Sequence, residues 1–454
     1  MSNGYQPSFP PNPQQPQGNP QYDQGYVQPQ PGYGQGYNAI PEQQYAPMDY
    51  GVVSHNRPPE QLYRVPATYS GPVAQNQFQA PQVYNHQGPF VPPEYLNTMR
   101  KSKTFNLVIL ILSSLALLVL FGLATLMGGT ITFFLALVPL TLVVLATIWI
   151  GRWDAEPVTM RILAFVWGSV GSIILTFALG GVWVDVIPGA TQQFIGLAVQ
   201  APVIEEFSKG IFVLAIALFL RKYIDGPIDA IVYMMLAAAG FAFTENILYF
   251  INSLTASGIV GLGLTFVLRG VMSPFAHALF SLPMGILIGI GVKKNFSPIQ
   301  LVGMFFAGYV PAMLLHSLWN GSSFLIPDMA VWFTFYLVVE LPLFLGAMFI
   351  IKWFRNQEAL RTYRYLTEYA WGGWFNPQEV ETLGTWSGRK FALKWAKNRG
   401  ANTMFLAKSL NKEVVDLTNL REDILNGKAS QQNLQREQYL LQKISHDKRL
   451  LINA

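Results

Sequence analysis

The side chains best suited to chemistry lie in the most apolar part of the chain. Glu205, Glu206 and Lys209 interrupt the apolar run that begins at Ala201, and Glu245 interrupts the next run. A charged side chain in hydrocarbon is costly, so such residues usually face a polar interior, pair with one another or mark a functional site. Two adjacent acids in one span and a third in the next therefore indicate a polar site inside a membrane protein.

Histidine, the other common acid–base residue, is scarce. The chain has five histidines, and two of them, His277 and His316, lie inside predicted spans. Glu340 stands alone before Pro342, and we interpret it as structural. The polar residues predicted to lie within the membrane are Glu205, Glu206, Lys209, Glu245, Asn246, Arg269, His277, His316, Asn320 and Glu340.

Four of these residues are predicted to lie at the same depth. Counted from the predicted cytoplasmic end of each span, Glu205, His277 and His316 each lie sixteen residues into the membrane, which is about 24 Å along a helix. Glu245 lies eighteen residues in, or about 27 Å. Because the hydrocarbon core is about 30 Å thick, all four fall in its outer third. We therefore expect four spans to build one site.

Carboxylates and imidazoles can hydrolyse a peptide bond in two ways. In the first, a glutamate is the general base on a water molecule and a histidine donates to the developing oxyanion. In the second, His277, His316 and one glutamate, with Glu245 as the candidate, hold a zinc ion while another glutamate is the base. The chain lacks the HExxH spacing of a helical zinc site, so the sequence leaves both mechanisms open.

Lys209 is placed to neutralise one acid and leave the other free to react. It follows Glu205 by four residues and Glu206 by three, so it can reach either on the same helix. Adjacent helical positions differ by about 100°, so the two acids cannot face the same point. The alternative is a buried polar cluster that only fixes helix packing.

Three supporting residues have two interpretations each. Asn246 and Asn320 can form hydrogen bonds between helices or contact substrate. Arg269 can pair with a carboxylate or extend to the membrane interface. The small residues of the AAAG run at 237–240 would let another helix approach closely beside the site.

Composition indicates a membrane protein. Of 454 residues, 51% are hydrophobic and 12% are charged, against about 25% charged in soluble domains. The net charge of +5 needs no nucleic-acid partner, since positive cytoplasmic loops are expected of any multi-span protein. The absence of cysteine excludes disulfides, thiolate metal ligands and a cysteine nucleophile. The first apolar run begins only after Lys103, so we expect no cleavable signal peptide.

We predict an all-α polytopic membrane protein with eight transmembrane helices. Lys and Arg are confined to alternate flanks of the spans, and the other four loops have none. The positive-inside rule therefore places both termini in the cytoplasm. The sixth span includes Pro274 and Pro283, so we expect it to be kinked or tilted. The spans are 105–126, 131–151, 160–182, 194–220, 228–252, 262–291, 299–320 and 330–353.

The composition divides the chain into three domains. Residues 1–103 are rich in Pro, Gln, Tyr and Gly, which predicts a disordered cytoplasmic tail with a capacity for weak self-association. Residues 104–354 form the eight-span membrane domain. Residues 355–454 are mixed and charged, which indicates a small helical cytoplasmic domain without a catalytic motif.

Four motifs resemble those of a known family. EEFSK (205–209) is similar to the EExxK motif of the PrsW family of intramembrane proteases, and FAFTENILY (241–249) resembles its aromatic-flanked Glu-Asn motif. RGVMSPFAHALFS (269–281) and HSLWNG (316–321) resemble its Arg-plus-His and His motifs. The motifs occur in the family's order, and the resemblance covers about residues 100–350.

The resemblance implies a bacterial membrane protease. The PrsW family is related to CAAX-prenyl endopeptidases and bacteriocin-processing proteins, and it includes proteases that cut membrane-anchored anti-sigma factors. It implies a first cut near the outer face of a single-span substrate in the lipid bilayer. The catalytic residues would then be Glu205, Glu206, Glu245, His277 and His316, supported by Lys209, Asn246, Arg269 and Asn320.

Two other functions remain open from the residues alone. Acids and histidines in spans also build proton-coupled transporters, although those usually have broken helices in pseudo-symmetric halves. Alternatively, the chain is a non-catalytic membrane scaffold on a protease fold, in which the tail and the C-terminal domain recruit partners.

Overall fold

The computed structural model describes residues 102–127, 129–187, 189 and 192–452. This part of the chain is helical and contains no strand, which confirms the all-α prediction. The predicted disordered tail, residues 1–103, lies outside the described residues except for its last two.

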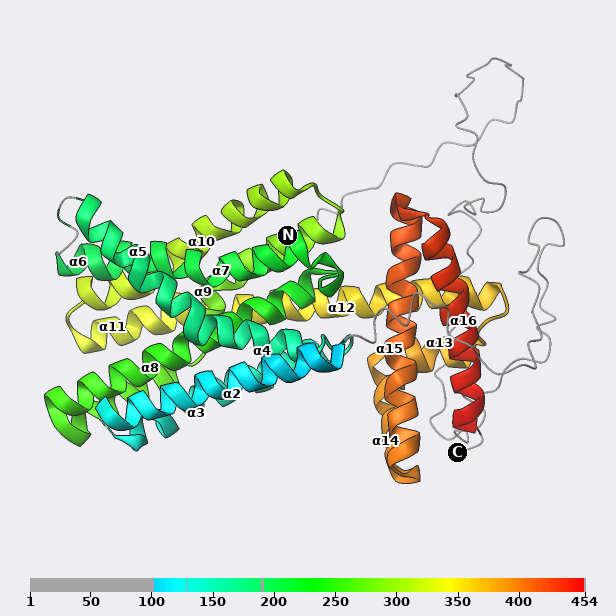
Figure 1. The fold of residues 1–454 in the computed structure, drawn as a ribbon, viewed down its shortest axis with the longest axis horizontal. Helices are drawn as coiled ribbons and strands as arrows, with labels where there is room; N and C mark the ends of the chain where they lie inside the picture. Colours follow the sequence, from blue (N-terminus) through cyan, green and yellow to red (C-terminus); the bar gives the residue numbers. More distant parts are fainter. Residues whose placement is uncertain (1–101, 128, 188, 190–191, 453–454) are drawn as a thin grey trace, which may run out of the picture. The chain divides into compact units, whose positions relative to one another are not determined.

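The first helices form the apolar region of the chain (Figure 1). Short π-helical segments interrupt several of them, and such segments frequently occur at functional sites. In chain order the elements are α2 (Ser102–Met127), α3 (Thr130–Ile150), α4 (Val158–Val166), η4 (Trp167–Ser172), α5 (Ile173–Val186), α6 (Gln193–Ile195), η5 (Gly196–Gln200), α7 (Ala201–Phe219), η6 (Arg221–Tyr223), α8 (Pro227–Phe266), η7 (Val267–Met272), α9 (Ala276–Lys293), α10 (Pro298–Leu325), α11 (Met329–Phe335), η8 (Tyr336–Glu340) and α12 (Leu341–Trp371).

Six helical stretches of the described residues are long and apolar enough to cross a membrane. The chain is therefore a multi-pass membrane protein. The stretch Pro227–Lys293 contains two of the eight predicted spans. Helix α7 is not among the six, and it carries three charged residues, Glu205, Glu206 and Lys209, within nineteen. The six stretches are Leu107–Met127, Thr130–Ile150, Val158–Val186, Pro227–Lys293, Pro298–Leu325 and Met329–Trp371.

The long stretch from Pro227 to Lys293 is broken twice. Gly258 has a φ of 66° inside α8, a conformation that glycine adopts without steric cost. Residues 273–275 separate η7 from α9 and include Pro274, while Pro283 lies within α9. The interruption expected from the prolines is therefore confirmed at Pro274.

Helix α8 is the centre of the bundle. Its first half is almost completely buried, and it packs against α3, α4, η4, α7 and α9 (Figure 1). A Cβ at Gly240 would lie 2.1 Å from the carbonyl oxygen of Phe165, and one at Gly168 would lie 1.8 Å from that of Ala237. The close helix approach expected at residues 237–240 is therefore made by α4 and η4.

The remaining elements are α13 (Pro377–Gly384), α14 (Trp386–Arg399), α15 (Ala401–Asp423), η9 (Ile424–Lys428) and α16 (Gln431–Ile452). They share a hydrophobic core with the end of α12, centred on Leu366, Leu410 and Ile444. A buried ion pair of 3.0 Å joins Lys448 of α16 to Glu379 of α13. Helix α12 runs without a break through residue 355, where the sequence analysis placed a domain boundary.

Candidate active site

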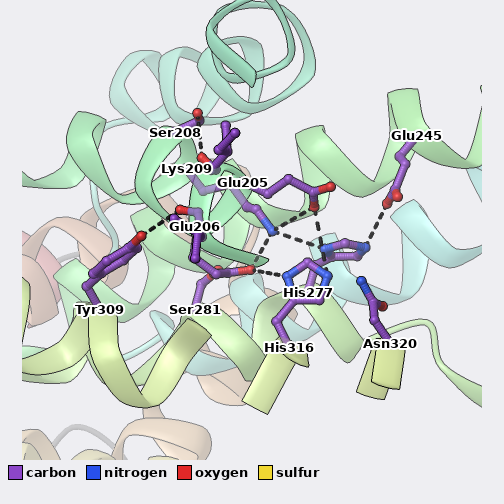
Figure 2. Close-up of polar contacts among 12 residues, drawn as sticks. Glu205, Glu206, Ser208, Lys209, Glu245, His277, Ser281, Tyr309, His316 and Asn320 are labelled. Carbon is purple, nitrogen blue, oxygen red and sulfur yellow. Dashed lines mark hydrogen bonds and ion pairs between the residues drawn. The ribbon is translucent and has the colours of Figure 1, made fainter. Parts of the chain in front are cut away.

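Four helices bring the predicted acids and histidines together (Figure 2). Helix α7 carries Glu205 and Glu206, α8 carries Glu245, α9 carries His277 and α10 carries His316. Hydrogen bonds and ion pairs connect all five side chains into one cluster through Lys209 and between facing helices. The side chains that were expected to meet at one depth therefore lie together in the structure.

Glu206 is enclosed by three hydrogen-bond donors. Its Oε1 lies 2.6 Å from Lys209 Nζ and 2.9 Å from His316 Nδ1, and its Oε2 accepts a 2.5 Å bond from Ser281 Oγ. The side chain is completely buried. Because a carboxylate only accepts, His316 donates through Nδ1 and its Nε2 carries the lone pair. Glu206 is thus held as a fixed, neutralised anion that orients His316.

Glu205 has no such partners. It is 8% exposed, and its Oε2 is buried without a hydrogen bond. That oxygen lies 3.8 Å from Lys209 Nζ and 3.9 Å from His316 Nε2. Glu205 also lines a cavity of about 640 Å³. Of the two adjacent acids, Glu205 is therefore the one available to a reacting group.

Glu245 orients the second histidine. Its Oε2 lies 2.8 Å from His277 Nε2 and accepts a 2.6 Å bond from Arg269, whose Nε also donates to Asn246 Oδ1 at 2.7 Å. The Nδ1 of His277 lies 3.1 Å from Lys209 Nζ. Because the ammonium only donates and the carboxylate only accepts, His277 is protonated at Nε2 and has its lone pair on Nδ1.

Aromatic rings hold this polar cluster in place. The rings of His277 and His316 are perpendicular, with centroids 5.2 Å apart, and Phe280 stacks on His316 at 4.7 Å. Phe241 lies under the Lys209 ammonium, 4.5 Å from its ring centre. A cation above an aromatic face is stabilised electrostatically, so the ring supports a charge that is buried in the bundle.

Sequence reasoning missed three residues of the site. Ser281, Phe280 and Phe241 contact the predicted residues but were not singled out. Ser281 could have been found, because it follows His277 by four residues on the same helix and so points the same way. The two phenylalanines are indistinguishable in sequence from the many other apolar residues of the spans.

Two of the supporting residues have structural partners. Asn320 Nδ2 donates to the carbonyl oxygen of Leu197 at 2.9 Å, which joins α10 to η5. Arg269 lies 4.0 Å from the ring centre of Tyr249 in addition to its pairing with Glu245. Glu340 is buried in η8, and its Oε1 has no hydrogen bond.

The side chains of Glu205, His277 and His316 fit a metal ion. One ligand atom from each lies within 4.8 Å of the others. Two imidazoles and a carboxylate are a donor set that zinc accepts, and a carboxylate behind each imidazole is the usual support for such ligands. The sequence analysis gave Glu245 as the candidate carboxylate ligand, whereas here Glu205 takes that place and Glu245 holds His277. Metal binding requires Lys209 to move away from His277 Nδ1.

Comparisons with known proteins match the part of the chain that contains this cluster. Residues 156–347 match the PrsW family intramembrane metalloprotease model. Protease PrsW of Geobacillus kaustophilus is 28% identical over 172 residues, which cover 37% of this chain and 69% of the relative. Protease PrsW of Clostridioides difficile is 28% identical over 193 residues, which cover 41% of this chain and 77% of the relative. No solved structure matches the chain. Residues 156–347 therefore match the PrsW family of intramembrane metalloproteases, and the relatives support a membrane protease.

Proposed function

We propose that this protease hydrolyses a peptide bond of a single-span membrane protein near the outer face of the plasma membrane. The proposed topology has eight spans, with both termini and the residues 355–454 in the cytoplasm. The confinement of Lys and Arg to alternate loops supports this orientation. The depth of about 24–27 Å from the cytoplasmic flanks supports cleavage in the outer third of the bilayer.

The observation that carries the proposal is the contrast between the two adjacent acids. Glu206 is enclosed by donors, while Glu205 presents a buried oxygen without a hydrogen bond to a cavity. A buried polar atom that lacks a partner costs free energy, so a structural cluster would be expected to satisfy it. An oxygen reserved for water, metal or substrate explains both the missing bond and the cavity.

We infer that Glu205, His277 and His316 hold a zinc ion. A bound zinc would lower the pKa of a water molecule and polarise the scissile carbonyl. The residues of the chain have distinct tasks around these ligands. Glu206 and Glu245 fix the two imidazoles with their lone pairs on His316 Nε2 and His277 Nδ1, the two nitrogens that are not bonded to a carboxylate.

The metal-free mechanism makes a different demand on His316. In that mechanism Glu205 takes a proton from a water molecule while the oxygen of that water bonds to the carbonyl carbon. Glu205 later gives the proton to the leaving amine. The oxyanion then needs a donor, and the Nδ1–H of His316 already bonds to Glu206. With His316 as that donor, the mechanism requires a second proton on its Nε2, which the zinc mechanism does not.

The substrate class follows from the family resemblance and the proposed depth. A membrane-anchored anti-sigma factor has one span and an outer segment that such a site could cut first. We propose a substrate of this kind, recognised in the bilayer.

Reconstitution with tagged single-span membrane proteins would test the proposal. Glu205→Gln removes the carboxylate that holds zinc in one mechanism and takes the proton in the other, and Glu340→Gln is its matched control because it neutralises another buried acid in the membrane region. We expect wild type and Glu340→Gln to cleave, and Glu205→Gln to lose at least a hundredfold in rate. Zinc should co-purify with wild type, less with His316→Ala, and a chelator should stop cleavage.

Each outcome has a separate meaning. Cleavage by Glu205→Gln at the wild-type rate would overturn the role of Glu205. Full activity of a zinc-free preparation would overturn the metal assignment and leave the glutamate mechanism. Cleavage only of segments on the cytoplasmic side would overturn the proposed orientation.

A further inference from the structure

A groove leads from the end of two neighbouring helices to Glu205. One wall is the face of α5 at residues 176–185, and the other is the face of η5 and α7 at residues 196–205. Helices α5 and α7 lie next to each other (Figure 1). The volume between the two faces is about 640 Å³, within the usual range of ligand sites, about 300–1,000 Å³.

The walls of the groove are shaped by small residues. Gly180 and Gly181 lie side by side on α5, opposite Gly196 and Ala201. A Cβ at Gly181 would meet nothing within 4 Å, and one at Gly180 would meet only Gln200 Nε2, at 3.4 Å. Neither glycine has a positive φ. These two glycines therefore keep the groove open, and no left-handed backbone conformation requires them.

The groove also contains polar atoms that hydrocarbon cannot satisfy. The Oγ1 of Thr176 and the Oε2 of Glu205 are buried without hydrogen bonds. Gln200 Nε2 makes a single long contact, 3.4 Å, to the carbonyl oxygen of Gly180. A lipid chain would leave these atoms unpaired at a cost, whereas an extended peptide offers backbone donors and acceptors at every residue.

We propose that this groove binds an extended stretch of the substrate beside the scissile bond and that the open space at Gly180 and Gly181 accommodates bulky side chains. This inference rests on the proposed proteolytic function and adds its sequence preference. Gly196 and Glu205 are nine positions apart, which is about 13.5 Å along a helix and corresponds to about four residues of extended peptide. Thr176 and Gln200 are binding residues for that backbone.

The first test fills the groove. Gly181→Leu places a side chain where nothing stands within 4 Å, and Gly346→Leu is the matched control because its position in α12 is equally open but lies outside the groove. The probes are single-span proteins with four alanine and glycine residues, or four leucine and phenylalanine residues, beside the scissile bond. We expect wild type to cleave both segments, with kcat/KM for the bulky segment no more than tenfold below that for the small one, because the groove has room for large side chains.

The two variants should then differ in kcat/KM. Gly181→Leu should lower kcat/KM for the bulky segment at least tenfold, since even one methylene in a pocket discriminates about 10–200-fold, and Gly346→Leu should stay within twofold of wild type. Wild type that cleaves the bulky segment more than tenfold more slowly than the small one, or a Gly181→Leu enzyme that cleaves it within twofold of wild type, would overturn the groove while leaving the proteolytic function intact.

The second test needs no cleavage. The chain has no cysteine, so single cysteines can be introduced without a background. In Glu205→Gln protein, Val184→Cys lines the groove, whereas Ile174→Cys lies on the same helix, is 63% exposed and does not line it. With a mild oxidant added to take up the two electrons, a probe with one cysteine beside the scissile bond should form a disulfide with the Val184→Cys variant and not with the Ile174→Cys variant. Equal cross-linking at both positions would refute the groove, whatever the activity assays show.

Discussion

Removal of the Lys209 ammonium should separate folding from catalysis. Its Nζ lies 2.6 Å from Glu206 Oε1, 3.1 Å from His277 Nδ1 and 3.8 Å from Glu205 Oε2, and the side chain is completely buried. Lys209→Met keeps an unbranched chain of similar length without the charge. The substitution would leave the Glu206 carboxylate buried with only Ser281 and His316 as partners.

The size of the effect follows from that uncompensated charge. Loss of one partner of a buried ion pair costs about 3–5 kcal/mol, a large share of a typical total stability of about 5–15 kcal/mol. The double variant Lys209→Met with Glu206→Gln removes both charges, so it should recover most of the lost stability. Its cleavage rate should remain about 10–100-fold below wild type, because loss of a residue behind a metal ligand typically costs that much.

Denaturant unfolding in one detergent, together with cleavage of a single-span protein, would measure both quantities. The four proteins of the cycle are wild type, the two single variants and the double variant. If Lys209→Met is as stable as wild type within about 1 kcal/mol, the ammonium does not neutralise Glu206. A double variant less stable than both single variants would likewise refute the pairing, whereas a fully active one would show that neither residue positions the catalytic groups.

Three further predictions concern packing and pH. Ser281→Ala removes a donor from Glu206 and should cost about 1–3 kcal/mol in unfolding free energy, measured by denaturant titration. Gly240→Ala would press its Cβ against the carbonyl oxygen of Phe165, so its thermal unfolding temperature and membrane abundance should fall. Burial is the main reason that the pKa of Glu156 rises from 4.5 to about 8, so the folded protein keeps a proton there that the unfolded chain releases. Stability should therefore fall as pH rises from about 4.5 to 8, and Glu156→Gln should flatten that part of the curve; an unchanged curve would refute the assignment.

The convergence of the four motifs could be predicted because it depends only on helix geometry. A fixed rise per residue places Glu205, Glu245, His277 and His316 at a common depth once their spans are recognised. The close approach of another helix at Gly240 could also be predicted, because a run of small residues lets a neighbouring backbone come close.

Other features depend on contacts that one sequence does not contain. The break at Gly258 cannot be told from a glycine inside a straight helix. The groove needs the face of α5 to lie opposite η5 and α7, and nothing in the residues of α5 says which helix it will meet. Phe241 and Phe280 contribute through their position against Lys209 and His316, which only the packed bundle defines.

The different contacts of Glu205 and Glu206 could be predicted only in part from the sequence. Helix geometry requires adjacent residues to point about 100° apart, so one acid had to face away from the partners of the other. Helices α9 and α10 determine which acid is hydrogen-bonded, because Ser281 and His316 both bond to Glu206. Glu205 has an oxygen without a hydrogen bond and lines the cavity. An acid that is bonded to an imidazole and an acid that borders a cavity thus arise from two neighbouring positions of one helix.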